Sequence, residues 1–181
     1  MPSPTPWIAL LRGVNVGGHR KLPMAQLRTL VEGAGYGNVR TYIQSRNVVF
    51  TATIDDPGAA ARSLEALILA ETGIDTTVTL RSRDQLAAVI AAHPFVDRAE
   101  DPKHLHVSFC VGDLDDSGLR AADPARWAPD EVATGTAELY LHCPRGMGRS
   151  KLTPKLIERL VGGSATTRNW RTVNKLLEMC G

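Results

Sequence analysis

Hydrophobic residues in the first eighty positions follow two periods, one typical of strands and one typical of helices. Residues 7–11 form a short apolar run that stops at a glycine-rich segment, which indicates a buried strand. From about residue 23 to 34, apolar positions recur at spacings of three and four, as on one face of a helix. Pro23 suits the first turn of this helix, and Gly33 and Gly35 mark its end.

Two β-branched and aromatic runs follow, at residues 39–43 and 47–51. The polar residues between them predict a hairpin. A second helix is expected from Pro57, and residues 77–80 alternate as a strand. The predicted order is strand, helix, strand, strand, helix, strand, which is the split βαβ plan of ferredoxin-like folds.

The second half of the chain shows a looser version of this order. A linking helix is expected from about residue 84 to 92. A strand, a short helix, a hairpin, a helix and an extended piece then follow at residues 104–111, 117–122, 131–142, 153–160 and 165–167. A last helix carries Trp170, Val173, Leu176 and Leu177.

We therefore predict an α+β fold of two tandem ferredoxin-like (βαββαβ-type) units with an extra C-terminal helix. The expected domains are an α+β unit over residues 1–82, a linking helix and loop over residues 83–100, and a second α+β unit with the C-terminal helix over residues 101–181.

Composition places the chain among ordinary folded proteins. Of 181 residues, 22% are charged and 43% hydrophobic, so wholesale disorder is not expected. The sequence contains no run of about 18 apolar residues, so no membrane span is predicted. The N-terminus lacks the pattern of a signal peptide. Three widely spaced cysteines indicate a reducing, cytoplasmic setting without a disulfide framework.

Charge is segregated along the chain. The total of +2 argues against a strongly basic nucleic-acid binder. Residues 1–96 carry +2, residues 97–138 carry −6 and residues 139–181 carry +6. Two interpretations stay open: solvated faces with intramolecular pairing, or an anion-binding C-terminal surface.

Four polar segments in predicted loops are candidates for holding an anion. Glycines let the main chain approach a phosphate, and helix N-termini favour negative charge. An exposed Trp170 can stack on a ring beside the arginines of its segment. The candidate ligand-binding residues are Arg12, Asn15, Gly17, Gly18, Gln44, Ser45, Asn47, Arg149, Ser150, Lys151, Thr167, Arg168, Asn169 and Trp170.

Each segment also has a purely structural interpretation. Residues 12–21 can use their glycines only for positive φ, residues 44–47 can be a polar turn, and residues 144–151 can be a flexible loop. Trp170 can belong to the core, with Thr167 or Asn169 capping a helix.

No metal or cofactor is expected, and the sequence assigns no catalytic residue. The segment from Asp113 begins like a calcium loop but has Pro124 where a bidentate Glu is required. His104 and His106 lack a second ligand pair with metal spacing. The four segments contain no Asp, Glu or Cys, and His19 is their only titratable base, so catalysis ranks below binding.

At these segments the chain resembles the bacterial domain of unknown function family 1697. The matching stretches are residues 9–18, Met24 with Leu27, and residues 39–45, 47–50, 148–152 and 165–173. The resemblance implies a two-part α+β fold and no established activity. One position departs from the family, because Arg46 stands where the family has glycine. In a left-handed conformation Arg46 would be strained by roughly 1–2 kcal/mol. Two alternatives avoid this strain or use the residue: the turn here differs from that of the family, or Arg46 adds a positive charge to the site.

The function that these observations favour is the binding of a phosphate-bearing ligand, either a nucleotide or a nucleic-acid end. The four segments would then converge in a cleft between the two units. One alternative is an enzyme acting on a phosphorylated or nucleotide substrate. Another is a protein-interaction module that uses the acidic block over residues 97–138.

Overall fold

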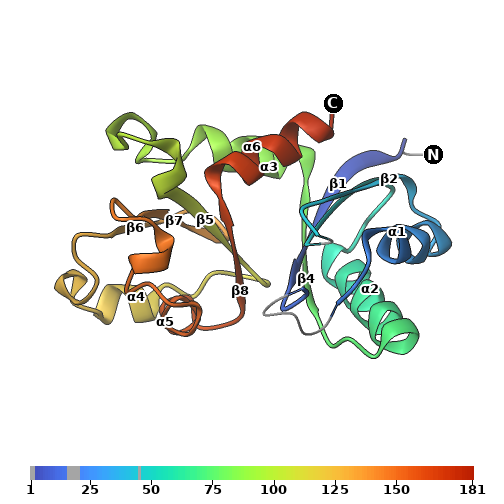
Figure 1. Cartoon of the computed structure of the whole chain (residues 1–181), viewed down its shortest axis with the longest axis horizontal. Coiled ribbons are helices and arrows are strands. Elements are labelled where there is room, and N and C mark those ends of the chain that lie inside the picture. Colours follow the sequence, from blue (N-terminus) through green and yellow to red (C-terminus); the bar gives the residue numbers. More distant parts are fainter. Residues whose placement is uncertain (1–2, 16–20, 45) are drawn as a thin grey trace. The chain divides into compact units, whose positions relative to one another are not determined.

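The computed structural model describes residues 3–15, 21–44 and 46–181 (Figure 1). Within these residues the chain is mixed α+β, with two four-stranded antiparallel sheets and six α-helices, which confirms the predicted class. The chain divides into two units, one of residues 1–87 with 176–181 and one of residues 88–175. The divisions fall inside helices α3 (Arg83–Ala91) and α6 (Trp170–Met179). Each unit is described by itself.

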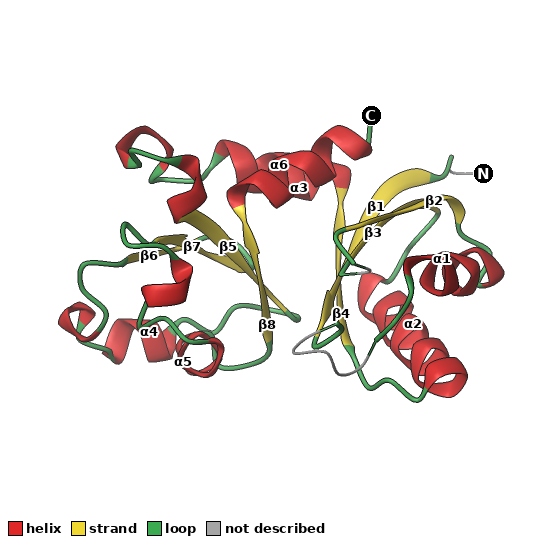
Figure 2. Ribbon diagram, in the orientation of Figure 1, coloured by secondary structure: helices red, strands yellow, loops and turns green. Residues whose placement is uncertain are grey.

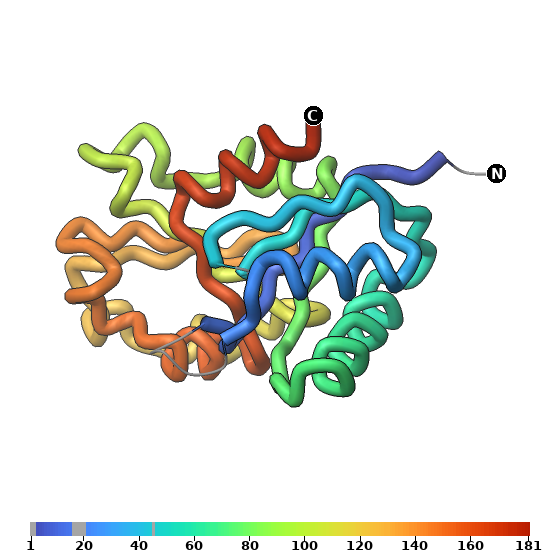
Figure 3. The backbone as a smooth tube through the Cα atoms, turned by 45° about the vertical axis from the view of Figure 1, so that its right-hand side comes forward, coloured from blue at the N-terminus to red at the C-terminus, as the bar shows by residue number. Residues whose placement is uncertain are grey.

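The first unit is a sheet with two helices on one side. Its elements are β1 (Thr5–Arg12), α1 (Met24–Gly33), β2 (Gly37–Tyr42), β3 (Asn47–Ala52), α2 (Pro57–Thr72) and β4 (Thr77–Ser82). The strands lie in the order β2-β3-β1-β4. Helices α1 and α2 lie side by side against this sheet in both views of the backbone (Figures 1 and 3).

Local signals explain where these helices start and stop. Asp56 accepts a hydrogen bond from the Ala59 amide (3.0 Å) and caps α2, and Gly73 ends it with a left-handed φ of 68°. Helix α1 begins one residue later than Pro23, which is the extended N-cap and not part of the first turn as predicted. This places the proline outside the helix, so α1 starts without a side-chain cap.

Strand alternation builds the core of the first unit. Alternate residues of β1 pack with β3 and β4 and with the inner faces of α1 and α2. This core includes Ala9, Leu11, Leu27, Val48, Phe50, Ile68 and Val78. The Phe50 ring stacks on Tyr36 with centroids 4.6 Å apart. Burying a large apolar side chain contributes about 1.5–3 kcal/mol, so this layer holds the helices on the sheet.

The second unit repeats the relative strand order of the first. Its elements are β5 (Leu105–Cys110), α4 (Ser117–Ala121), β6 (Glu131–Thr134), β7 (Glu138–His142), α5 (Pro154–Leu160) and β8 (Ala165–Asn169). The strand order is β6-β7-β5-β8. Helices α4 and α5 lie together on one side of this sheet (Figure 2), over a core that includes Leu139, Leu141 and Ile157.

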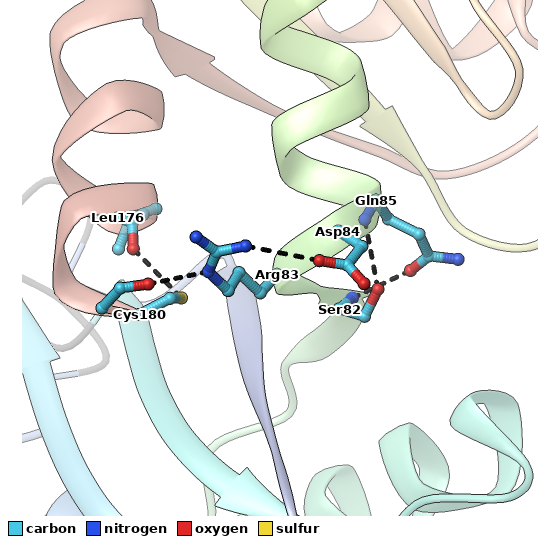
Figure 4. A network of polar contacts seen from close by, with 7 residues as sticks. Ser82, Arg83, Asp84, Gln85, Leu176 and Cys180 are labelled. Atoms are coloured by element: carbon cyan, nitrogen blue, oxygen red, sulfur yellow. Dashed lines mark hydrogen bonds and ion pairs between the residues drawn. The ribbon is translucent and has the colours of Figure 1, made fainter.

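The start of α3 and the end of the chain meet within the first unit (Figure 4). Ser82 and Gln85 form a capping box, in which each main-chain amide donates to the other side chain, at 2.8 and 3.2 Å. Arg83 Nε donates to the main-chain oxygen of Gly181 (2.8 Å), and Arg40 donates to that of Met179. These contacts explain why residues 176–181 group with the first unit, whereas the boundaries at 82 and 100 stay a prediction.

None of the helices in the described part of the chain has the length and apolar character needed to cross a membrane.

The close approach of α4 and α5 depends on Gly118. A Cβ there would lie 2.4 Å from the main-chain oxygen of Arg159. We expect Gly118→Ala to lower the free energy of unfolding by about 1–3 kcal/mol, because the backbones must separate. Gly163→Ala is the control, since a Cβ at Gly163 meets nothing within 4 Å. Urea denaturation measures both, and equal midpoints for the two variants would contradict this account.

Candidate ligand-binding site

The side chain of Asn15 joins the loop after β1 to the tip of the β2–β3 hairpin. Its Oδ1 accepts a hydrogen bond from the Leu22 amide (2.9 Å). Its Nδ2 donates to the Leu22 oxygen (3.2 Å) and to the Gln44 oxygen. The Leu11 amide also donates to the Arg46 oxygen (2.8 Å). The structure therefore brings together the first two predicted segments.

Three non-glycine residues around this junction have a left-handed backbone. They are Asn15 (φ 53°), Ile43 (φ 52°) and Gln44 (φ 46°). Asparagine tolerates this conformation, but a β-branched isoleucine is strained in it. The Arg46 amide donates to the Ile43 oxygen (3.1 Å), and this main-chain bond closes the hairpin tip. Strain of this kind clusters at functional sites.

A cavity of about 390 Å³ lies at the same place. Its lining combines three polar side chains with three apolar ones: Asn15, Lys21, Gln44, Leu22, Pro23 and Met24. Small-molecule sites of a few hundred Å³ commonly have this mixture of apolar walls and a few polar groups.

The N-terminus of α1 lines this cavity, and among the described residues neither its N-cap nor its first turn supplies an acceptor side chain. Pro23 and Met24 belong to both the lining and the helix start. Pro23 gives no side-chain cap, and the first turn contains no acidic residue. Four other helices are capped by side chains, namely α2, α3, α5 and α6 by Asp56, Ser82, Thr153 and Asn169, whereas the N-cap residue of the short α4 makes no such bond either. The uncapped amides and the positive end of the helix dipole therefore favour an anion here.

The remaining predicted residues of the first unit have mixed roles. Asn47 is buried and its Nδ2 donates to the Tyr42 oxygen (3.0 Å), so it closes the hairpin. Arg12 ends β1, and its main-chain oxygen accepts from Thr76 Oγ1 (2.8 Å). Lys21 is exposed and forms no ion pair within the part of the chain that the structure describes. Gly17, Gly18 and Ser45 lie outside the described residues.

In the second unit, the predicted hydroxyl groups already have protein partners. Ser150 Oγ donates to Asp130 Oδ2 (2.7 Å) and accepts from the Leu152 amide (2.9 Å). It therefore fixes the loop that carries Arg149 and Lys151. Thr167 Oγ1 lies 2.6 Å from Ser108 Oγ on the neighbouring strand.

The alternation of β8 separates its candidate residues. Thr167 pairs with Ser108 and Asn169 with His106, so both lie on one face of the sheet. Arg168 lies on the opposite face, and it therefore cannot contact a ligand from the same side as Thr167 and Asn169. Asn169 caps α6 by accepting a hydrogen bond from the Thr172 amide (2.8 Å), which agrees with the interpretation that Asn169 is a helix cap.

Trp170 is half-buried and not a fully exposed platform. Its ring lies 4.7 Å from that of His93 in an edge arrangement. The candidate residues thus fall into two sets, up to Asn47 in the first unit and from Arg149 in the second. That the four segments form one cleft stays a prediction.

A buried histidine cluster in the second unit was missed by sequence reasoning. His93 is 5% exposed and its ring lies 4.9 Å from that of Tyr140. Burial, together with a smaller effect of the neighbouring His142 and His106, lowers the pKa of His93 to about 4. His142 Nδ1 lies 3.0 Å from Glu131 Oε1, and this contact lowers the pKa of Glu131. His93 lies in the loop after α3, so it reaches Tyr140 of β7 through a tertiary contact that no local pattern indicates.

Two features of the first site were also missed. The left-handed Ile43 carries no local signal, because isoleucine is rare in that conformation. The position of Lys21 at the cavity could be suspected only from the run of basic residues before α1. Across residues 3–15, 21–44 and 46–181, no group of three or more His, Cys, Asp or Glu is placed to hold a metal ion.

Comparison with known proteins identifies relatives in sequence and in structure. Residues 5–140 match the family described as "Protein of unknown function (DUF1697)". The fold is similar to that of the conserved bacterial protein SP0830 from Streptococcus pneumoniae, with a TM-score of 0.77 and 22% identity. That match covers 99% of this chain and 100% of the other. No curated protein matches the chain in sequence.

Removing the side chain of Ile43 should relieve the strain at the hairpin tip. Because Ile43 is 43% exposed, little burial is lost, and Ile43→Gly is expected to raise the free energy of unfolding by about 1 kcal/mol. Val111→Gly is the matched control, because Val111 is 41% exposed and has no positive φ. Replacing it with glycine should lower the free energy of unfolding. Chemical denaturation of both variants tests this, and destabilisation by Ile43→Gly would refute it.

Neutral His93 should make the fold sensitive to acid. The unfolded chain takes up a proton near pH 6.5 and the folded one near pH 4, so stability is full above about pH 6.5 and is lost as pH falls through that window. The loss attributable to His93 is up to about 3 kcal/mol. In thermal unfolding between pH 7 and pH 4, the melting temperature of His93→Phe should fall less steeply with decreasing pH than that of the control His104→Gln. Parallel curves would contradict the assignment.

Proposed function

Since the chain belongs to the DUF1697 family of proteins of unknown function, we propose a function from the geometry of its first unit: it binds a phosphate-bearing small molecule of nucleotide size. The observation that carries this proposal is the uncapped N-terminus of α1, which lines a cavity of about 390 Å³ beside Lys21. The phosphate would lie at the first turn of the helix.

The groups at this site complement a phosphate in charge and in hydrogen bonding. A helix N-terminus acts as roughly half a positive charge, and the Lys21 ammonium adds a full one. Free amides in the first turn can donate to phosphate oxygens. The apolar wall of Leu22, Pro23 and Met24 suits a sugar or a base. Asn15 acts by positioning, because its amide group is already bonded to the main chain.

The second unit carries positively charged side chains that suit a phosphate. We propose that Arg149 and Lys151 bind phosphate groups on the second unit by itself, with nucleic-acid ends as the ligand class there. The net charge of +6 over residues 139–181 supports this.

The same reasoning extends to the fold and the location. We infer that the units are tandem ferredoxin-like units, which the shared relative strand order supports. We also propose a cytoplasmic location. Cys110, Cys143 and Cys180 form no disulfide, which supports this location, since thiols persist in a reducing compartment.

Calorimetric titration with ATP tests the site in the first unit. We expect Lys21→Gln to weaken binding by about tenfold, because a charge-assisted hydrogen bond is lost. The matched control is Arg28→Gln, which removes the same charge from the middle of α1 and should bind as the wild type does. Equal losses in the two variants would show general electrostatic attraction and would defeat the proposal.

Salt dependence separates a small molecule from a nucleic-acid end. Single-stranded oligonucleotides that contact several phosphates give a log–log slope of about −0.7 per contact. We expect ATP to compete with a short oligonucleotide for the site. The slope of log affinity against log salt concentration for this oligonucleotide should correspond to no more than about two phosphate contacts. A much steeper slope without competition by ATP would favour an extended nucleic-acid surface instead.

A further inference from the structure

The second unit contains a cavity of its own, of about 490 Å³. It is lined by the segment before β5, by one residue each from β5 and β8, and by the first turn of α6: Asp101, Pro102, Lys103, His106, Asn169 and Arg171. All six lie within residues 88–175, so this cavity is separate from the one in the first unit.

His106, in the wall of this cavity, has one unsatisfied ring nitrogen. It stands on β5 directly opposite Asn169 of β8 and is 7% exposed. Its Nδ1 is buried and has no hydrogen-bond partner in the part of the chain that the structure describes. Buried polar groups in folded proteins are nearly always paired, so an orphaned one beside a cavity points to a bound partner.

The charges around His106 select for an anion. Lys103 Nζ pairs with Asp101 Oδ2 at 2.7 Å, so these two residues neutralise each other. Arg171 is exposed and forms no ion pair with any residue that the structure describes. Burial lowers the pKa of His106, which keeps the imidazole neutral near pH 7. One cationic group therefore remains without a counter-charge at the cavity.

We propose that this cavity is a second binding site, for a small organic anion that carries a carboxylate or a phosphate group. The anionic group pairs with the Arg171 guanidinium, whose fork of donors matches two oxygens of either group. The neutral His106 and the Asn169 amide hydrogen-bond to the rest of the molecule. A volume of about 490 Å³ admits a molecule of this class.

The test follows the imidazole C–H resonances of His106 by NMR, with inorganic phosphate and succinate as the two probes. We expect a saturable shift with at least one probe, and the stronger probe identifies the anionic group. Arg171→Gln should weaken that binding by about tenfold. Arg126→Gln removes the same charge outside the cavity and should bind normally. Lys21→Gln should also bind normally, which separates this site from the one in the first unit.

Two results would overturn the proposal. One is the absence of any His106 shift up to about 100 mM of either probe, where a millimolar site is saturated. The other is a shift of equal size and midpoint in Arg171→Gln and wild type. Because Arg171 is exposed, its replacement leaves the core intact, and the test does not depend on a variant of the buried His106.

Discussion

The amide group of Asn15 makes the hydrogen bonds on which the geometry of the first unit's site depends. It satisfies two main-chain groups of Leu22 and one of Gln44, a residue 29 positions away. Asparagine suits this position because it tolerates a left-handed backbone while its side chain offers both a donor and an acceptor. These bonds set where the chain enters α1, and therefore where its uncapped N-terminus meets the cavity.

The two units use one strand order for different chemistry. In the first, the N-cap Pro23 provides no side-chain acceptor for the amides at the start of α1. In the second, Asn169 caps α6 and Ser150 and Thr167 are bonded to Asp130 and Ser108. The unsatisfied group there is instead the buried His106 beside Arg171. Shared topology thus fixes where loops and helix ends lie, while individual side chains decide which of them is free to bind.

Periodicity and end signals made most of the fold predictable. Apolar spacing located α1, and Pro57 with Gly73 bounded α2, because these residues act through the local backbone. The site was less predictable, since it rests on pairing between distant segments. Nothing local shows that Ile43 is left-handed, nor that Arg168 faces away from Thr167. Both follow from tertiary contacts and strand register, which one sequence does not contain.

The central claim is that an anion binds at the first turn of α1, and an amide NMR titration of the wild-type protein with inorganic phosphate tests it most directly. The account predicts that the largest saturable ¹H–¹⁵N shifts occur at Ala25 and Gln26, with a smaller change at Gln44. Shifts confined to the loop of Arg149 and Lys151, with the α1 amides unmoved, would contradict it.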